Sequence, residues 1–159
     1  MGFQVGDTVV HWVYGLGEIT GHEERALMGE SQLYFVVKVQ DMNVWVPADR
    51  QVASRLRRPT PAKEFSKLFA ILRGPTGALS QDRRERKAQL RAQLAGGGAE
   101  SICHVIRDLT TLQQQKSLND DDQTMLKKAR GLLTREWGYS LEIGPAQAEA
   151  DLYQLLTKP

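Results

Sequence analysis

The sequence predicts an α+β protein of two small domains, a short-stranded antiparallel β-barrel followed by an all-α bundle of about five helices. The hydrophobic pattern changes from short β-branched and aromatic runs to a helical period near residues 53–60. The charge changes with it. Residues 1–52 carry three basic and seven acidic side chains, a balance of −4, whereas residues 53–95 carry eleven basic and three acidic ones, a balance of +8. We therefore expect domains at residues 1–58 and 59–159, with a surface for a polyanion on the second.

Short strands are expected in the first domain because β-branched and aromatic residues cluster between turn signals. The expected strands are residues 7–13, 17–23, 32–40 and 44–46. Gly15 and Gly17 permit a tight bend after the first strand, and a turn is expected at Met28-Gly29-Glu30. Five or so antiparallel strands in this length predict a small barrel of the SH3 or Tudor type.

The helical half begins at Thr60-Pro61, where threonine is the expected N-cap and proline the first helical residue. Further helices are expected at about residues 80–95, 102–112 and 119–137, with a short last helix after Gly144-Pro145. The fourth helix starts at Asn119 and carries three aspartates in its first turn, where the helix dipole favours negative charge. The apolar stripes of these helices predict the core of a bundle.

Catalysis is not expected. The chain has one cysteine and three histidines, none at metal-ligand spacing from another. Cys103 and His104 are neighbours and would point about 100° apart on a helix, so an enzyme that uses them, or His11, is the least favoured class. We expect no cofactor, metal or small-molecule substrate. The lone cysteine suits a reducing cytoplasm, and no apolar run approaches the ~20 residues of a membrane span.

The second helix is the best candidate for binding nucleic acid. Arg84, Lys87 and Arg91 recur at i, i+3 and i+7, and a row of long cations can meet successive phosphates without reading sequence. The candidate DNA contacts are Arg83, Arg84, Arg86, Lys87, Arg91, Lys127, Lys128 and Arg130. The alternatives are a solvated face, or a protein-interaction module that binds an acidic protein and no DNA.

The barrel offers a second mode of binding, because an exposed edge strand can pair with a strand of a partner. Val44-Trp45-Val46 alternates around an aromatic residue. An outward Trp45 would be an anchor for a protein partner, whereas an inward one would belong to the core. The pattern leaves both orientations open.

These residues resemble a known family. Residues 5–11 (VGDTVVH), the Gly15-x-Gly17 bend, residues 34–39 (YFVVKV) and residues 44–47 (VWVP) resemble the RNA polymerase-interacting domain shared by CarD/CdnL regulators and the transcription-repair coupling factor. The second half is similar to the helical domain of CarD/CdnL proteins at residues 69–73 (FAILR), 105–109 (VIRDL) and 125–130 (MLKKAR). The resemblance covers nearly the whole chain in one order.

The resemblance implies a bacterial transcription regulator whose barrel binds the protrusion lobe of the polymerase β subunit by strand pairing. Its helical domain would contact promoter DNA at the upstream edge of the melted bubble and stabilise the open complex. Arg25 matches a family arginine at the β-subunit contact, and Trp45 replaces a second one. Lys87, Lys128 and Arg130 fall in the family's basic segments.

One departure concerns a tryptophan wedge that the family usually carries at the start of the second helix. Gln81-Asp82 stands there instead, and neither side chain can hold open a base step as an apolar wedge does. Leu79 is the only nearby apolar candidate for that role. We therefore expect polymerase binding more firmly than stabilisation of the open complex by a wedge.

Overall fold

In a computed structural model of the chain, residues 2–27 and 29–157 are described. The chain divides into two compact units, Met1–Pro59 and Thr60–Pro159. Met28, part of the expected turn, lies outside the described residues. In the described part of the chain, no helix is both long enough and apolar enough to cross a membrane.

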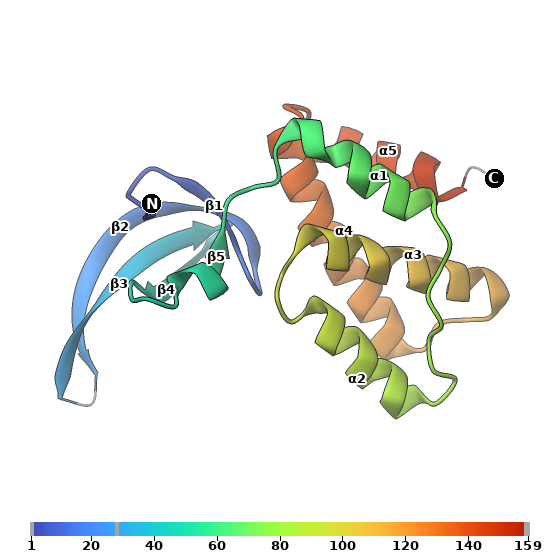
Figure 1. Cartoon of the computed structure of the whole chain (residues 1–159), viewed down its shortest axis with the longest axis horizontal. Coiled ribbons are helices and arrows are strands. Elements are labelled where there is room, and N and C mark those ends of the chain that lie inside the picture. Colours follow the sequence, from blue (N-terminus) through green and yellow to red (C-terminus); the bar gives the residue numbers. More distant parts are fainter. Residues whose placement is uncertain (1, 28, 158–159) are drawn as a thin grey trace. The chain divides into compact units, whose positions relative to one another are not determined.

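The first unit is one antiparallel sheet of five strands, labelled in Figure 1. The strands are β1 (Thr8–His11), β2 (Gly15–Leu27), β3 (Glu30–Val39), β4 (Met42–Pro47) and β5 (Leu56–Arg57), and a 3-10 turn at Val52–Ser54 precedes the last. Their order is β4-β3-β2-β1-β5, so β4 and β5 are the edge strands. The predicted antiparallel β unit is confirmed.

The long β2–β3 hairpin supplies most of the sheet, and a bulge between Ile19 and Gly21 shifts its register. One face is apolar, because Val9, Ile19, Val37, Val39, Val46 and Leu56 are all buried. The predicted bend at Gly15 is real, since this residue has a φ of +88°. Gly17 is needed for another reason: a Cβ there would lie 2.7 Å from the Lys38 carbonyl oxygen on β3.

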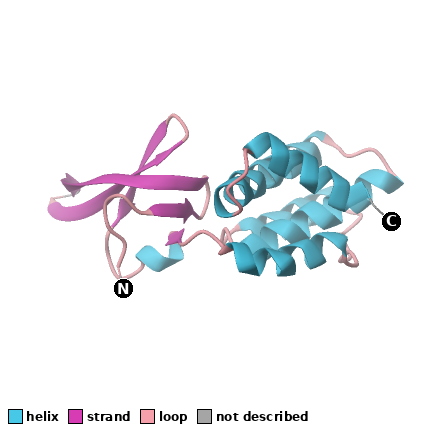
Figure 2. Ribbon diagram, turned by 90° about the horizontal axis from the view of Figure 1, so that it is seen from above, coloured by secondary structure: helices cyan, strands magenta, loops and turns pink. Residues whose placement is uncertain are grey.

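The second unit is a bundle of five helices, drawn in cyan in Figure 2. The helices are α1 (Phe65–Arg73), α2 (Arg83–Leu94), α3 (Ala99–Gln115), α4 (Asp120–Ser140) and α5 (Pro145–Thr157). The predicted five-helix bundle is confirmed. Its core includes a cluster of three aromatic rings. The ring centroid of Trp137 lies 4.9 Å from that of Phe69 and 6.1 Å from that of Phe65, and the two phenylalanine centroids are 6.0 Å apart.

Two of the predicted helix starts are settled by hydrogen bonds. Asn119 caps α4 as predicted, because its side chain accepts from the Asp122 backbone N–H. Thr60 does not cap a helix, because a 3-10 turn at Ala62–Glu64 separates it from α1, which starts at Phe65. The Thr60 N–H instead donates to the Glu136 carboxylate at 2.7 Å. Proline at position 61 stays extended, with ψ 148°, so the chain cannot enter a helix at that point.

His11 shapes the turn that follows β1. It is buried, and its Nδ1 accepts hydrogen bonds from the N–H groups of Val13 and Tyr14 at 3.1 and 3.2 Å. The imidazole stacks on Tyr14 with ring centroids 5.2 Å apart. Burial lowers the pKa of His11 below its ordinary value of 6.5. The turn therefore requires the neutral imidazole.

This requirement makes the stability of the first unit depend on pH. An unfolded chain takes up the His11 proton near pH 6.5, whereas the folded chain takes it up only at lower pH. We expect the free energy of unfolding to fall as the pH drops below 6.5 and to level off below the folded pKa. Urea unfolding between about pH 5 and 8 measures this. His11→Asn should remove this pH dependence, because the asparagine side-chain oxygen can also accept hydrogen bonds from the turn. The control is His22→Gln at an exposed position, which should keep the dependence. Equal pH profiles for the wild type and both variants would contradict the role of His11.

Candidate protein and nucleic-acid interfaces

A surface cluster of Glu23, Arg25 and Trp45, called here the Trp45 cluster, lies on the sheet across β2, β3 and β4. Trp45 is 39% exposed and pairs with Val36 on β3, which pairs in turn with Gly21 on β2. Its indole Nε1 donates to the Glu23 carboxylate at 2.9 Å. The Arg25 guanidinium stands 4.5 Å above the centre of the indole and 3.7 Å from Glu23. Trp45 therefore points outward, which answers the question that the sequence left open.

Val44 and Val46 flank Trp45 on β4 but face the core. Val46 is 1% exposed, and Val44 is half-buried against the same apolar cluster. Neither valine side chain is available as an anchor for a partner. Because β4 is an edge strand, a partner strand would meet these residues through their main chain.

Arg86, expected to contact DNA, is buried instead, and that expectation is wrong. It is 2% exposed, and its Nε and Nη2 donate to the two Asp122 carboxylate oxygens at 3.0 and 2.9 Å. Its Nη1 donates to the Ser80 carbonyl at 3.1 Å. Arg86 precedes Leu90 by four residues, so it lies on the buried stripe of α2. That spacing was the signal in the sequence.

The other expected DNA contacts fall into two groups. The exposed ones are Arg83, Arg84 and Arg91 on α2 and Lys127 and Lys128 on α4. Two more lie beside carboxylates: Lys87 Nζ is 3.5 Å from Asp121, and Arg130 Nη2 is 2.8 Å from Glu149. The net positive charge at those two positions is therefore smaller than the sequence indicates.

The term basic face is used here for four of these cations, Arg84, Lys87, Arg91 and Lys128, which lie on two helices that an ion pair links. Arg84, Lys87 and Arg91 follow one side of α2 at i, i+3 and i+7. The Lys87–Asp121 ion pair joins that side to α4, and Lys128 lies two helical turns, about 10 Å, beyond Asp121 on the same side of its helix. Arg83 and Lys127 flank the face.

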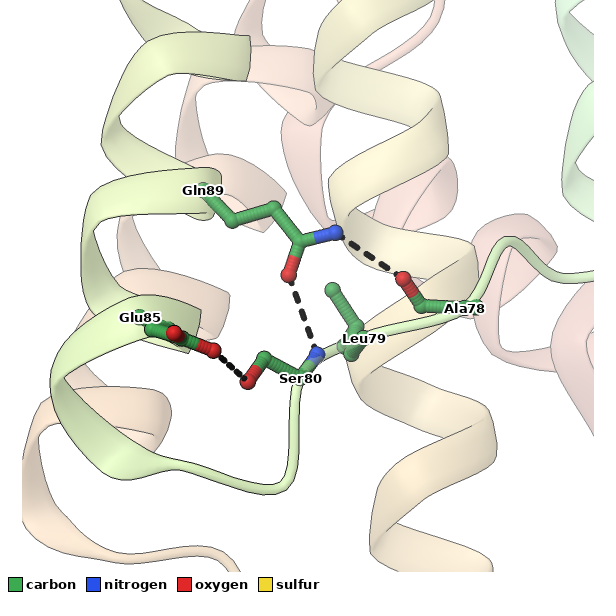
Figure 3. A pocket seen from close by; sticks show the side chains of 5 residues that line it. All are labelled: Ala78, Leu79, Ser80, Glu85 and Gln89. Atoms are coloured by element: carbon green, nitrogen blue, oxygen red, sulfur yellow. Dashed lines mark hydrogen bonds between the residues drawn. The ribbon is translucent and has the colours of Figure 1, made fainter.

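The loop before α2 holds the residues of the expected wedge position. Leu79 is half-buried and packs against the bundle core, which argues against the wedge role that the sequence offered for it. It lines an open hollow of about 380 Å³ with Ala78, Ser80, Glu85 and Gln89, drawn in Figure 3. The polar groups of the hollow bond one another: Gln89 bridges Ala78 and Ser80, and the Ser80 hydroxyl donates to Glu85 at 2.8 Å. Hydrogen bonds between the loop and α2 thus engage polar groups that line the hollow.

Asp82, one of the two residues at the expected wedge position, caps α2. Its carboxylate accepts from the backbone N–H groups of Arg84 and Glu85 at 2.9 and 3.0 Å. The side chain is therefore committed to the helix end, and its charge is stabilised there by the helix dipole.

Cys103 and His104 do not form a reactive pair. Cys103 is fully buried, and burial, with the nearby Glu136 and Glu100 carboxylates, raises the pKa of its thiol to about 12. His104 is exposed on α3. Within residues 2–27 and 29–157, no group of three His, Cys, Asp or Glu side chains could hold a metal ion.

Comparison with known families agrees with this arrangement. Residues 3–59 match the "CarD-like/TRCF RID domain", the RNA polymerase-interacting domain, and residues 67–153 match "CarD, C-terminal domain". The chain therefore belongs to the CarD family of non-enzymatic transcription regulators. It is 27% identical over 137 residues to a Bacillus subtilis (strain 168) protein named "Putative transcription factor YdeB", and the match covers 84% of this chain and 89% of that protein.

Proposed function

We propose that this chain is a bacterial transcription regulator that binds the polymerase β subunit, on its protrusion lobe, through β4 and the Trp45 cluster. Its helical unit contacts promoter DNA through phosphates and modulates formation of the open complex. It acts in the cytoplasm, at the nucleoid.

The polymerase contact is supported by the outward Trp45 beside an unpaired strand edge. An edge strand supplies main-chain donors and acceptors, and an aromatic residue under an arginine supplies a broad apolar and cationic anchor. The Arg25–Trp45 stack holds the guanidinium over the ring, so the residue that replaces a family arginine works with the arginine that remains. This observation carries the proposal.

The DNA contact is supported by the basic face. Its cations lie about one or two helical turns apart, which suits contacts with phosphates along a duplex backbone. Leu79 is held in the bundle, and Asp82 is held in a cap. The proposed contact therefore positions the protein on DNA and adds affinity, but it does not read the base sequence and inserts no apolar wedge.

The salt dependence of binding tests the DNA contact. Each phosphate contact on B-DNA contributes about 0.9 to the slope of log K against log salt, so three to five contacts give a slope of roughly −3 to −4.5. Arg84→Gln with Arg91→Gln should reduce that slope by about two and weaken binding equally for unrelated sequences. Fluorescence anisotropy on two random duplexes at several salt concentrations measures both effects.

The matched control is Lys63→Gln with Lys67→Gln, which removes the same charge at exposed positions outside the basic face. It should leave the slope unchanged. An equal flattening by both pairs would mean that only net charge matters, and a loss confined to one of the two duplexes would contradict phosphate contacts.

The second candidate function is a protein-interaction module that binds no DNA. One observation favours it: Lys87 and Arg130, two of the expected contacts, are already beside carboxylates of the same chain. This candidate predicts no salt-dependent binding to random duplex even at low salt, so the same titration separates the two functions.

A further inference from the structure

The loop that leads into α2 is held by side chains of α2 and α3, and one of these side chains, Arg86, is held in turn by Asp122 of α4. We infer that Arg86, Gln89, Asp108 and Asp122, called here the bracing network, are positioning residues that set the first turn of α2 against nucleic acid. The inference rests on the proposed function of the basic face, which it deepens. None of the four side chains needs to touch DNA itself.

The centre of the network is the Arg86–Asp122 ion pair. Both side chains are almost fully buried, at 3% and 5% exposure, and the pair is bidentate. The third nitrogen of the same guanidinium donates to the loop carbonyls of Ser80, at 3.1 Å, and Gln81, at 3.5 Å. One side chain thus ties the loop, α2 and the capped first turn of α4 together at one point.

Gln89 holds the loop a second time, one turn along α2. Its Oε1 accepts from the Ser80 N–H at 3.1 Å, and its Nε2 donates to the Ala78 carbonyl at 2.9 Å, as Figure 3 shows. The primary amide therefore bonds the backbone at two points, in the manner of a neighbouring strand.

Asp108 on α3 holds the beginning of the same loop. Its buried carboxylate accepts from the Gly77 N–H at 2.7 Å. A Cβ on Gly77 would lie 3.2 Å from the other oxygen of that carboxylate, so a larger residue there would require the carboxylate to shift slightly.

The bracing has a physical purpose at a binding surface. The loop contains Gly74, Pro75 and Gly77 and ends at the Asp82 cap, directly before Arg83 and Arg84. A loop of this composition that had to be ordered during binding would lose conformational entropy at that moment and weaken the complex. A loop that side-chain hydrogen bonds already hold avoids that loss, so the cations that follow it are presented in one arrangement.

The first test replaces Gln89 by leucine, which has a similar size and cannot bond the loop. Gln89→Leu should weaken binding to random duplex by roughly three- to tenfold with the salt slope unchanged, because the loop loosens while the phosphate contacts remain. The amide proton of Ser80 should exchange faster with solvent in the free protein. The control is Gln93→Leu, a half-buried glutamine one turn further along α2 whose Oε1 has no hydrogen-bond partner among the described residues; it should change neither quantity.

The second test separates positioning from stability. In Arg86→Met with Asp122→Leu, two apolar side chains replace the buried pair, and such exchanges often preserve or raise stability. The loop carbonyls of Ser80 and Gln81 nevertheless lose their donor. We expect an unfolding midpoint close to that of the wild type together with weaker duplex binding. Wild-type affinity in this stable variant, or in Gln89→Leu, would overturn the inference.

Failure of the inference and failure of the proposed function are distinguishable. If the wild type shows no salt-dependent binding to duplex, the proposed DNA contact fails and the positioning role with it. If the wild type binds and the loop variants bind equally well, only the positioning role fails.

Discussion

Arg86→Met is expected to lower the free energy of unfolding of the helical unit by about 3–5 kcal/mol, because it leaves the Asp122 carboxylate buried without its partner. Asp122 is 4% exposed, and both of its oxygens accept from Arg86. Its backbone N–H is already engaged by the Asn119 cap, so the helix start holds the carboxylate in place. Urea unfolding of the full chain, followed by helical circular dichroism, measures the loss.

The matched control is Arg83→Met, which removes the same charge three residues earlier, at an exposed position of α2. It should alter stability by no more than about 0.5 kcal/mol. A loss for Arg86→Met as small as that of the control would show that the pair does not hold the bundle together. The double replacement of Arg86 and Asp122 by apolar residues should recover most of the loss.

The second large effect is expected at the proposed polymerase contact. Arg25→Glu should weaken binding of the full chain to an isolated β-protrusion fragment by about 2 kcal/mol or more, which is roughly thirtyfold in Kd. The change removes the cation above Trp45 and places a carboxylate beside Glu23. The fold should remain intact, because the Arg25 side chain is about half exposed. Isothermal titration calorimetry checks the affinity.

Arg57→Glu provides a charge reversal on β5, at the opposite edge of the sheet. It should leave the affinity for the fragment within about twofold, a free energy of about 0.4 kcal/mol. If Arg25→Glu binds as tightly as the wild type, the docking surface is not the Trp45 cluster. Equal weakening by both reversals would indicate long-range attraction rather than a contact.

Helices were easier to predict than strands because each helix carries its own period. The apolar stripes of all five helices and the Asn119 cap were visible in residues close together in sequence. β5 was not, because Leu56–Arg57 is two residues long and shows no alternation; only its pairing with Val10 and His11 makes it a strand. Thr60 is not a cap because Pro61 stays extended and a 3-10 turn separates it from α1, and its N–H is instead bonded by Glu136, 76 residues away.

The interfaces were predicted less well, because their charges are used inside the protein. Arg86 and Asp122 are 36 residues apart, and no local pattern states that they meet. Glu23 was missed for the same reason: it meets Trp45 only when β2 and β4 lie on either side of β3. Local spacing showed which cations line one side of α2, whereas tertiary packing decides which of them are neutralised.

Cys103 has a practical consequence for spectroscopy. It is the only cysteine of the chain, and a thiol that is fully buried with a pKa raised to about 12 is almost entirely protonated at neutral pH. Maleimide reagents need the thiolate, so the native residue should stay unmodified while the protein is folded. A cysteine introduced at the exposed Gln81 position would then carry a fluorophore alone, with no need to remove the native residue. The motion of the loop could be followed by time-resolved anisotropy in a chain that is otherwise wild type.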